Sequence, residues 1–133
     1  MPEDKKDGSA NSRSSFQDQG AYLHCYGCGS NNSDGLQLKS YWDGNESVAE
    51  FFPEPFHCGG SPEIVYGGLV ASLADCHSCN LAVANCYRLE LRSIGSEPRI
   101  LCVTAQLNVS LIKPTPISSA ISLRARIREI QKN

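Results

Sequence analysis

The sequence lacks the features that mark several classes of protein. It has no apolar run of about 18 residues, the length that a membrane-spanning helix needs, and no apolar segment of secretion-signal length at its N-terminus. Excess charge is also missing, because 12 Lys and Arg stand against 14 Asp and Glu, a formal net charge of −2. We therefore expect neither nucleic acid nor a membrane as a partner, and we expect a cytoplasmic location.

Cysteine is present in an odd number, seven. Without a secretion signal, this count indicates a reducing compartment and mostly free thiols. Cys25-x-x-Cys28 and Cys76-x-x-Cys79 have the local spacing of zinc ligands, but 47 residues separate the pairs, where a zinc ribbon has about 15 to 20. Cysteines inside a helix usually act as small apolar filler. We expect no metal site and no cofactor, and a zinc-stapled interaction module remains the third hypothesis.

The chain has 133 residues, which suits one domain with one core. Residues 1–20 are polar and mixed in charge, with Phe16 as their single aromatic residue. Such a composition cannot bury enough apolar surface to offset the entropy of ordering. We predict a disordered tail at 1–20 and one domain at 21–133.

Several segments of that domain have the apolar alternation of strands. Residues 36–42 and 47–52 flank Asp-Gly-Asn-Glu, a turn sequence, and predict a hairpin. Residues 101–111 and 121–128 also alternate, the second with a basic face. Between them, Gly67 to about Leu89 is apolar around most of a helical circumference. The order predicts an α+β fold, with an antiparallel sheet wrapped around one long central helix.

The helix start, "YGGLVASLAD" at 66–75, together with this order of elements, resembles the hotdog-fold acyl-CoA thioesterases of the phenylacetate-pathway (PaaI-like) type. That family has His-Gly-Gly at the start of its central helix and an acid seven residues after the second glycine; Gly67, Gly68 and Asp75 match. "CYGCGSNNSDGLQLKSYWDG" resembles the family's Cys-x-x-Cys-Gly lead-in, and "VTAQLNVSLIKPTP" its first strand after the helix. The resemblance implies about two further strands, so we expect the domain to be C-terminally incomplete.

The resemblance implies a thioester hydrolase without metal or cofactor, acting on an acyl-CoA or a related thioester. The amide of Gly68 would stabilise the oxyanion, and Asp75 would be nucleophile or general base. Gly68 and Asp75 are two helical turns apart, about 10 Å, and the family joins the two groups across a homodimer, which also occurs within tetramers. The alternative for Asp75 is an ordinary acid on a solvated helix face.

Two family positions differ in this chain. Tyr66 replaces the histidine, and Gly60 replaces a polar residue, often Asn, that helps to position water. His57, in the preceding loop, is a candidate to orient water instead. Because substrate binding tolerates both changes better than hydrolysis does, a hotdog protein that binds a thioester without turnover is the second hypothesis.

Four residues are candidates for substrate contact: Tyr66, His57, Thr104 and Lys113. Thr104 aligns with a family hydroxyl near the acid, but strand parity places it on the polar face, where it would need a partner subunit or a twisted sheet edge to take part. The alternative is a plain strand threonine. Lys113 and the basic face of 121–128 suit the phosphates of coenzyme A or, alternatively, a solvated surface. For His77 we expect a buried, hydrogen-bonded side chain.

Overall fold

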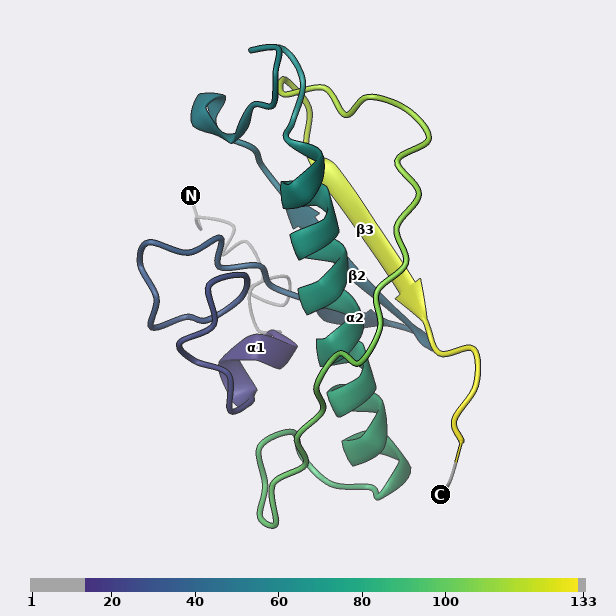
Figure 1. Ribbon diagram of the computed structural model, residues 1–133. Helices are drawn as coiled ribbons and strands as arrows, with labels where there is room; N and C mark the ends of the chain where they lie inside the picture. The colour runs from purple at the N-terminus through teal and green to yellow at the C-terminus, as the bar shows by residue number, and fades with distance from the viewer. Residues whose placement is uncertain (1–13, 132–133) are drawn as a thin grey trace, which may run out of the picture.

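A computed structural model describes residues 14–131, which fold as one long helix against a small sheet (Figure 1). Helix α2 (Gly67–Leu89) has the predicted bounds. Three antiparallel strands, β1 (Tyr41–Asp43), β2 (Glu46–Phe51) and β3 (Ile121–Arg126), lie in the order β1-β2-β3. A short helix α1 (Phe16–Gln19) and a 3-10 turn η2 (Pro55–His57) complete the elements. The α+β class is as predicted.

The predicted hairpin is present but shorter at its start. Asp43 pairs with Glu46 across a two-residue turn, whose first residue, Gly44, has a φ of +63°; glycine adopts this left-handed conformation without steric cost. The backbone of residues 36–40 bonds to the N-terminal loop instead of to β2: the amide of Leu38 donates to the carbonyl of Gly27 at 3.1 Å. Residues 36–40, the first part of the predicted strand, are thus bonded to the loop and are not part of β1.

Helix α2 is buried along most of its length, as its apolar circumference predicts. Its buried side chains are Leu69, Leu73, His77, Asn80, Leu81, Val83, Ala84 and Tyr87. The sheet covers one side of the helix (Figure 1), and the core forms between them, with Leu73 at 0% exposure. Burial of such a side chain contributes on the order of 2 kcal/mol.

His77 is a structural residue of this core, as expected. It is 2% exposed, and its ring lies between two buried serines. Nδ1 is 2.8 Å from the Ser40 hydroxyl and Nε2 is 3.0 Å from the Ser47 hydroxyl. Because a buried polar group is costly unless it is paired, these bonds fix the helix to β2 and to the segment before β1.

His77 should make the stability of the fold depend on pH. Burial lowers the pKa of His77, because the interior disfavours the charged ring, while an unfolded chain keeps a value near about 6.5. Between these two values the unfolded state binds more protons, so the free energy of unfolding decreases as the pH falls below about 6.5. We expect the Tm to fall between about pH 7.5 and about pH 5, and to fall less in His77→Gln. A slope equal to wild type in His77→Gln would contradict this, and exposed His24→Gln is the control.

The predicted disordered tail ends earlier than residue 20. Residues 1–13 lie outside the described part of the chain, but Ser15 caps α1 by accepting a hydrogen bond from the amide of Asp18 at 3.1 Å. Phe16 is 3% exposed and packs edge-on against Trp42, with 5.1 Å between ring centroids. The prediction was wrong for these residues because one buried aromatic ring and a capping serine order a segment that is otherwise polar.

The prediction of a strand at 101–111 was also wrong for the described chain. The segment is extended, but it makes no strand ladder with any described residue, and Leu101 and Val103 are 61% and 86% exposed. It runs back along α2 from the C-terminal end of the helix to its start (Figure 1), where the Leu111 side chain lies against Gly67. Alternation of apolar and polar residues indicates that an extended segment would have one apolar face. A strand also needs a neighbouring backbone to pair with, and this segment has none among the described residues.

Candidate functional site

The start of α2 presents two unpaired amides. Leu69 N donates to the carbonyl of Tyr66 at 3.0 Å, as in the first turn of any helix. Among the described residues, no backbone carbonyl accepts from Gly67 N or Gly68 N. The first amides of a helix point along its axis and carry the positive end of the helix dipole. The glycine pair therefore forms a site suited to a carbonyl oxygen or an anion.

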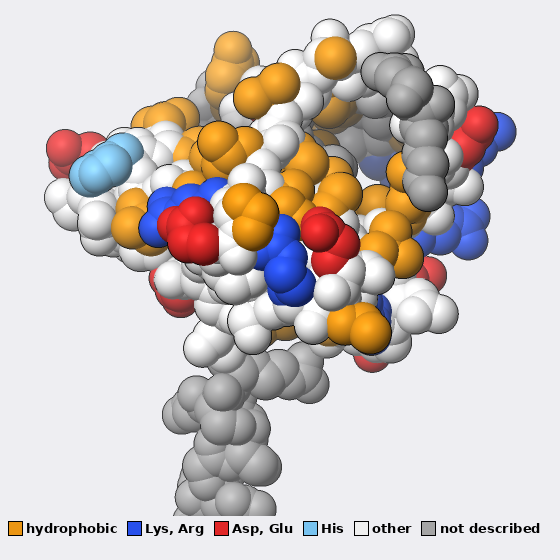
Figure 2. Space-filling view, turned by 90° about the horizontal axis from the view of Figure 1, so that it is seen from below, with side chains coloured by type: hydrophobic (Ala, Val, Ile, Leu, Met, Phe, Trp, Pro, Cys, Tyr) orange, Lys and Arg blue, Asp and Glu red, His pale blue; other side chains and the backbone are white. Residues whose placement is uncertain are grey.

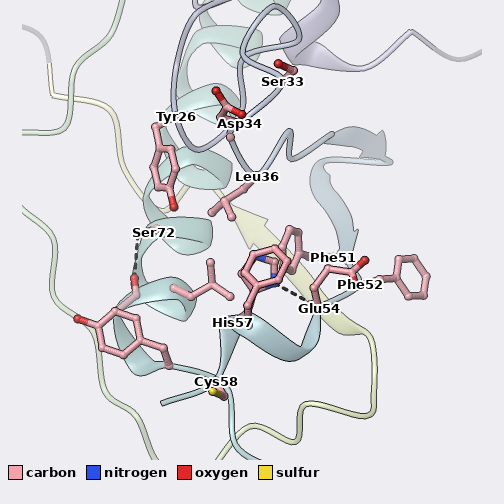
Figure 3. Close-up of a pocket in the computed structure, with 15 residues that line it drawn as sticks. Tyr26, Ser33, Asp34, Leu36, Phe51, Phe52, Glu54, His57, Cys58 and Ser72 are labelled. Atoms are coloured by element: carbon pink, nitrogen blue, oxygen red, sulfur yellow. Dashed lines mark hydrogen bonds between the residues drawn. The ribbon is translucent and has the colours of Figure 1, made fainter. Parts of the chain in front are cut away.

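A cavity of about 690 Å³ lies beside this helix start (Figure 3). One wall is α2, through Gly68, Leu69 and Ser72. The N-terminal loop and the stretch from the end of β2 through η2 to the start of α2 complete the cavity. They contribute Tyr26, Ser33, Asp34, Gly35, Leu36, Phe51, Phe52, Glu54, Phe56, His57, Cys58 and Tyr66. The mixture of aromatic and polar side chains is typical of a site for a small organic molecule.

Tyr66 lies directly over the second glycine. A Cβ at position 68 would come within 2.4 Å of the Tyr66 ring, so residue 68 must be glycine while the ring stays in place. Tyr66 is 60% exposed and its side chain makes no capping hydrogen bond to the helix. Tyr66 therefore lies both at the edge of the cavity and beside Gly68. A residue that contacts substrate would have to lie in this position.

His57 lines the same cavity and is held on several sides. Its Nδ1 accepts a hydrogen bond from the amide of Glu54 at 2.8 Å. Its ring centroid lies 4.3 Å from that of Phe56 and 5.4 Å from that of Phe51. Because Nδ1 is an acceptor here, the neutral ring carries its proton on Nε2. His57 can thus donate to a water or a carbonyl in the cavity.

Asp75 lies two turns further along α2 and is half-buried. The Thr104 hydroxyl donates to its Oδ1 at 2.5 Å within the same chain. The expectation that Thr104 would need a partner subunit or a twisted sheet edge to meet the acid was therefore wrong, because the segment around it is not a strand and reaches Asp75 directly. No Lys or Arg of residues 14–131 forms an ion pair with Asp75. In the described part of the chain, the carboxylate therefore has a hydroxyl to orient it and no Lys or Arg as an ion-pair partner.

The chain resembles a solved structure over most of its length. It is 40% identical to a thioesterase superfamily protein from Shewanella loihica PV-4, and the match covers 76% of this chain and 77% of that one, with a TM-score of 0.59. No protein-family model and no curated protein matches. The chain belongs to the thioesterase superfamily. Its long helix on an antiparallel sheet is the superfamily's α+β hotdog fold.

Three separate places in this thioesterase-superfamily chain hold the site residues predicted from sequence. Gly68, Tyr66 and His57 share the large cavity. Asp75 and Thr104 line a smaller one of about 120 Å³. Lys113 lines a third cavity, of about 320 Å³, which also includes Gly67 and lies beside residues 111–115. The sequence did not reveal this division, since it depends on how the loops pack around α2.

Arg124, one of the two basic residues of β3, is paired with acidic side chains. Arg124 makes ion pairs with Asp43 at 3.0 Å and with Glu46 at 2.6 Å, as a solvated strand face would. The face seen in Figure 2 carries basic and acidic side chains interspersed among apolar ones. Within residues 14–131, no helix combines the length and the apolar character needed to cross a membrane.

Proposed function

We propose that the protein is an acyl-CoA thioesterase-like hydrolase of the phenylacetate-pathway type. The observation that carries this proposal is the pairing on one helix of a glycine-opened start with Asp75, a carboxylate whose hydrogen-bond partner is Thr104. Membership of the thioesterase superfamily supports the reaction class. The acyl-CoA substrate, the residue roles and the subtype are part of the proposal.

In the proposed reaction, the thioester carbonyl points at the Gly68 amide. Charge builds on that oxygen as the tetrahedral intermediate forms, and a fixed N–H donor of this kind contributes on the order of 3 kcal/mol. The space that a Cβ would fill is occupied by Leu111 at Gly67 and by the Tyr66 ring at Gly68, so the carbonyl would reach the Gly68 amide after the exposed Tyr66 ring moves aside. The acyl group would occupy the cavity of about 690 Å³, whose walls include Phe51, Phe52 and Leu69.

The acid would come from a second copy of the chain. Seven residues separate Gly68 from Asp75, about 10 Å along the helix, which is too far for both to act on one carbon. The apolar side chains exposed on 101–112, Leu101, Val103, Leu107, Val109, Leu111 and Ile112, support the presence of a partner surface near α2. We propose a homodimer, alone or within a tetramer, in which each Asp75 serves the neighbour's helix start.

Asp75 would activate water or attack the thioester carbon itself. The Thr104 hydroxyl holds Oδ1, which leaves Oδ2 for the reaction. As general base, Oδ2 takes a proton from water while the water oxygen attacks the carbonyl carbon, and the thiolate of coenzyme A leaves. As nucleophile, Oδ2 attacks the carbonyl carbon, the carbon–sulfur bond breaks as the thiolate of coenzyme A leaves, and water then cleaves the resulting anhydride. Both routes yield a carboxylic acid and a free thiol.

A second candidate is binding of an acyl-CoA without turnover. Tyr66 favours it, because its ring lies against Gly68 and crowds the approach to that amide. Gly60 also favours it, since glycine offers no side chain to position water.

Hydrolysis of a panel of acyl-CoA substrates separates the two candidates. We expect release of free thiol from at least one aliphatic or aromatic member, followed with a thiol-reactive chromophore, at a rate well above the uncatalysed reaction. Isothermal titration with the same panel reports binding. Affinity without thiol release would support the binding protein and refute the hydrolase, and absence of both would refute the acyl-CoA proposal altogether. Heat-unfolded protein is the control for background hydrolysis.

A further inference from the structure

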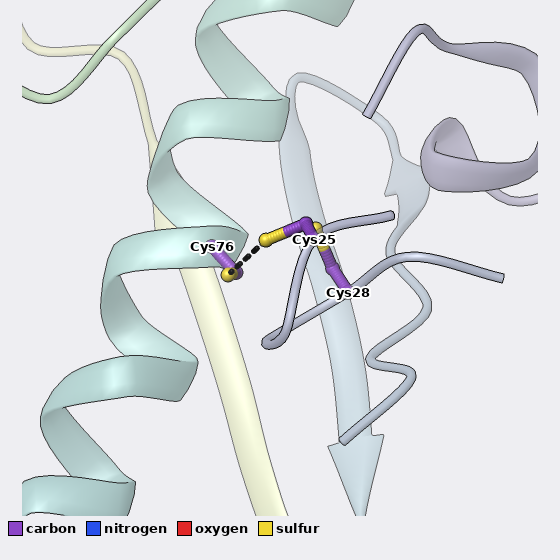
Figure 4. Close-up of side chains that lie close together, drawn as sticks. All are labelled: Cys25, Cys28 and Cys76. Carbon is purple, nitrogen blue, oxygen red and sulfur yellow. Dashed lines mark hydrogen bonds between the residues drawn. The ribbon is translucent and has the colours of Figure 1, made fainter. Parts of the chain in front are cut away.

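Three cysteines from distant parts of the sequence converge beside α2. The sulfurs of Cys25, Cys28 and Cys76 all lie within 4.8 Å of one another (Figure 4). The Cys25 and Cys76 sulfurs are 3.8 Å apart. In a tetrahedral zinc site with Zn–S bonds of about 2.3 Å, neighbouring sulfurs are about 3.8 Å apart. The three thiols thus have a separation that one zinc ion can bridge.

The loop that carries Cys25 and Cys28 is shaped to make this approach. A Cβ on Gly27 would lie 2.2 Å from the Cys76 sulfur, and a Cβ on Gly29 would lie 2.4 Å from the amide nitrogen of Cys25. Gly29 N donates to the carbonyl of Cys25 at 2.8 Å, which closes a tight turn around the pair. The glycines of Cys-Tyr-Gly-Cys-Gly therefore serve the convergence of the sulfurs.

The surroundings favour a thiolate in the cluster. Cys28 is 2% exposed, and Asn80 Nδ2, itself on a buried side chain, lies 3.5 Å from its sulfur as a donor. Metal sites regularly include hydrogen-bond donors that do not touch the metal but hold the ligating side chains in position. Zinc binds cysteine as the deprotonated thiolate, and the Asn80 amide donates toward the sulfur that would carry that charge.

We propose that Cys25, Cys28 and Cys76 bind one zinc ion, with the fourth coordination position open to solvent. The sulfur of Cys79, which the sequence pairs with Cys76, lies outside the group of described sulfurs that are within 4.8 Å of one another, and it donates instead to the carbonyl of Cys102 at 3.2 Å. The cavity of about 120 Å³ beside the cluster, lined also by Tyr22, Asp75 and Thr104, provides the fourth position. Three protein ligands with one exchangeable position are the pattern of zinc sites that bind water or a small molecule.

This ion would tie the N-terminal loop to the middle of α2. Cys25 and Cys28 of the N-terminal loop and Cys76 of α2 supply its ligands. The spacing that a zinc ribbon needs between two Cys-x-x-Cys pairs is therefore not required. The spacing between the two Cys-x-x-Cys pairs indicated no zinc site. In the folded chain, however, the sulfurs that converge come from one pair, Cys25 and Cys28, and from Cys76 alone of the other.

Metal content measures the proposal directly. The untagged chain, reduced and loaded with zinc chloride, is dialysed and analysed by atomic emission, and we expect about one zinc per chain. In Cys25→Ser and Cys76→Ser the content should fall at least tenfold. Cobalt(II) should give thiolate-to-metal charge-transfer absorption in wild type but not in these variants. Cys86→Ser, on the same helix outside the cluster, is the matched control and should keep the metal.

Folding of the variants is checked without metal. Far-ultraviolet circular dichroism and the Tm in the presence of a chelator should match wild type under the same conditions. Because Cys25 lies on a half-buried loop, Cys25→Ser remains informative even if the helix variant does not fold. Substoichiometric zinc in the reduced wild type, retention of zinc by folded Cys25→Ser, or a Cys25–Cys76 disulfide that persists after reductant treatment would each overturn the proposal.

Discussion

Asp75→Asn is expected to reduce kcat for acyl-CoA hydrolysis by about 10² to 10⁴-fold, the range that a positioned general base contributes. The exchange keeps the shape of the side chain, and the amide oxygen can still accept from the Thr104 hydroxyl, which lies 2.5 Å from Oδ1 in the wild type. What is lost is the negative oxygen that takes the proton from water or attacks the carbonyl. Steady-state kinetics of thiol release measures the effect, and an unchanged Tm shows that the fold persists.

Two substitutions of Thr104, assayed in the same way, test how much its hydroxyl contributes to the role of Asp75. Thr104→Val removes the donor to Asp75 and should lower kcat by about 10 to 100-fold, because a hydrogen bond to a charged group contributes about 1.5–3 kcal/mol. Thr104→Ser keeps the hydroxyl and should restore most of the activity, which a purely structural threonine would not require. Glu50→Gln, an exposed acid on β2, is the control. Full activity in Asp75→Asn would remove Asp75 from the mechanism.

The sequence predicted α2 well because the evidence for it is local. Gly67-Gly68 and the apolar circumference that follows placed its start at Gly67 and its end at Leu89, as observed. The turn at Gly44 and the alternation of β3 are local in the same sense. The pairing of strands and the ordering of residues 15–20 depend on partners elsewhere in the chain, so the sequence placed them less well.

The candidate site was only partly visible in the sequence. Gly68 and Asp75 became candidates through the resemblance to the family's glycine-glycine-acid motif. The contact between Thr104 and Asp75 was not foreseen, because it arises where residues 101–112 follow the helix instead of joining a sheet. The cysteine cluster was missed for a related reason. Cys25 and Cys76 are 51 residues apart in sequence, and the glycine at 27, which lies against the Cys76 sulfur, is the local sign that the loop packs closely on another element.

The second large effect is expected from mixing two inactive chains. Gly68→Val should inactivate the helix start, because its branched side chain would fill the space beside the Gly68 backbone, next to the Tyr66 ring, that the thioester carbonyl must enter. Asp75→Asn inactivates the acid. If each site takes its helix start from one chain and its acid from the other, a mixed dimer contains one site with both wild-type groups. Random pairing in equal amounts then restores activity at about a quarter of all sites.

Co-expression of the two chains with different affinity tags, followed by two-step purification, isolates the mixed dimer for assay. Each parent alone should show about 1% of wild-type activity or less, so the rescue is a rise of at least tenfold in kcat. A dimer that carries Asp75→Asn in both chains, purified in the same way, controls for contaminating hydrolase. Rescue requires both a partner subunit and a site between the two helices. A mixed dimer as inactive as its parents would show that Gly68 and Asp75 do not act on the same substrate across the interface, because every other group of the proposed site is unchanged in that dimer.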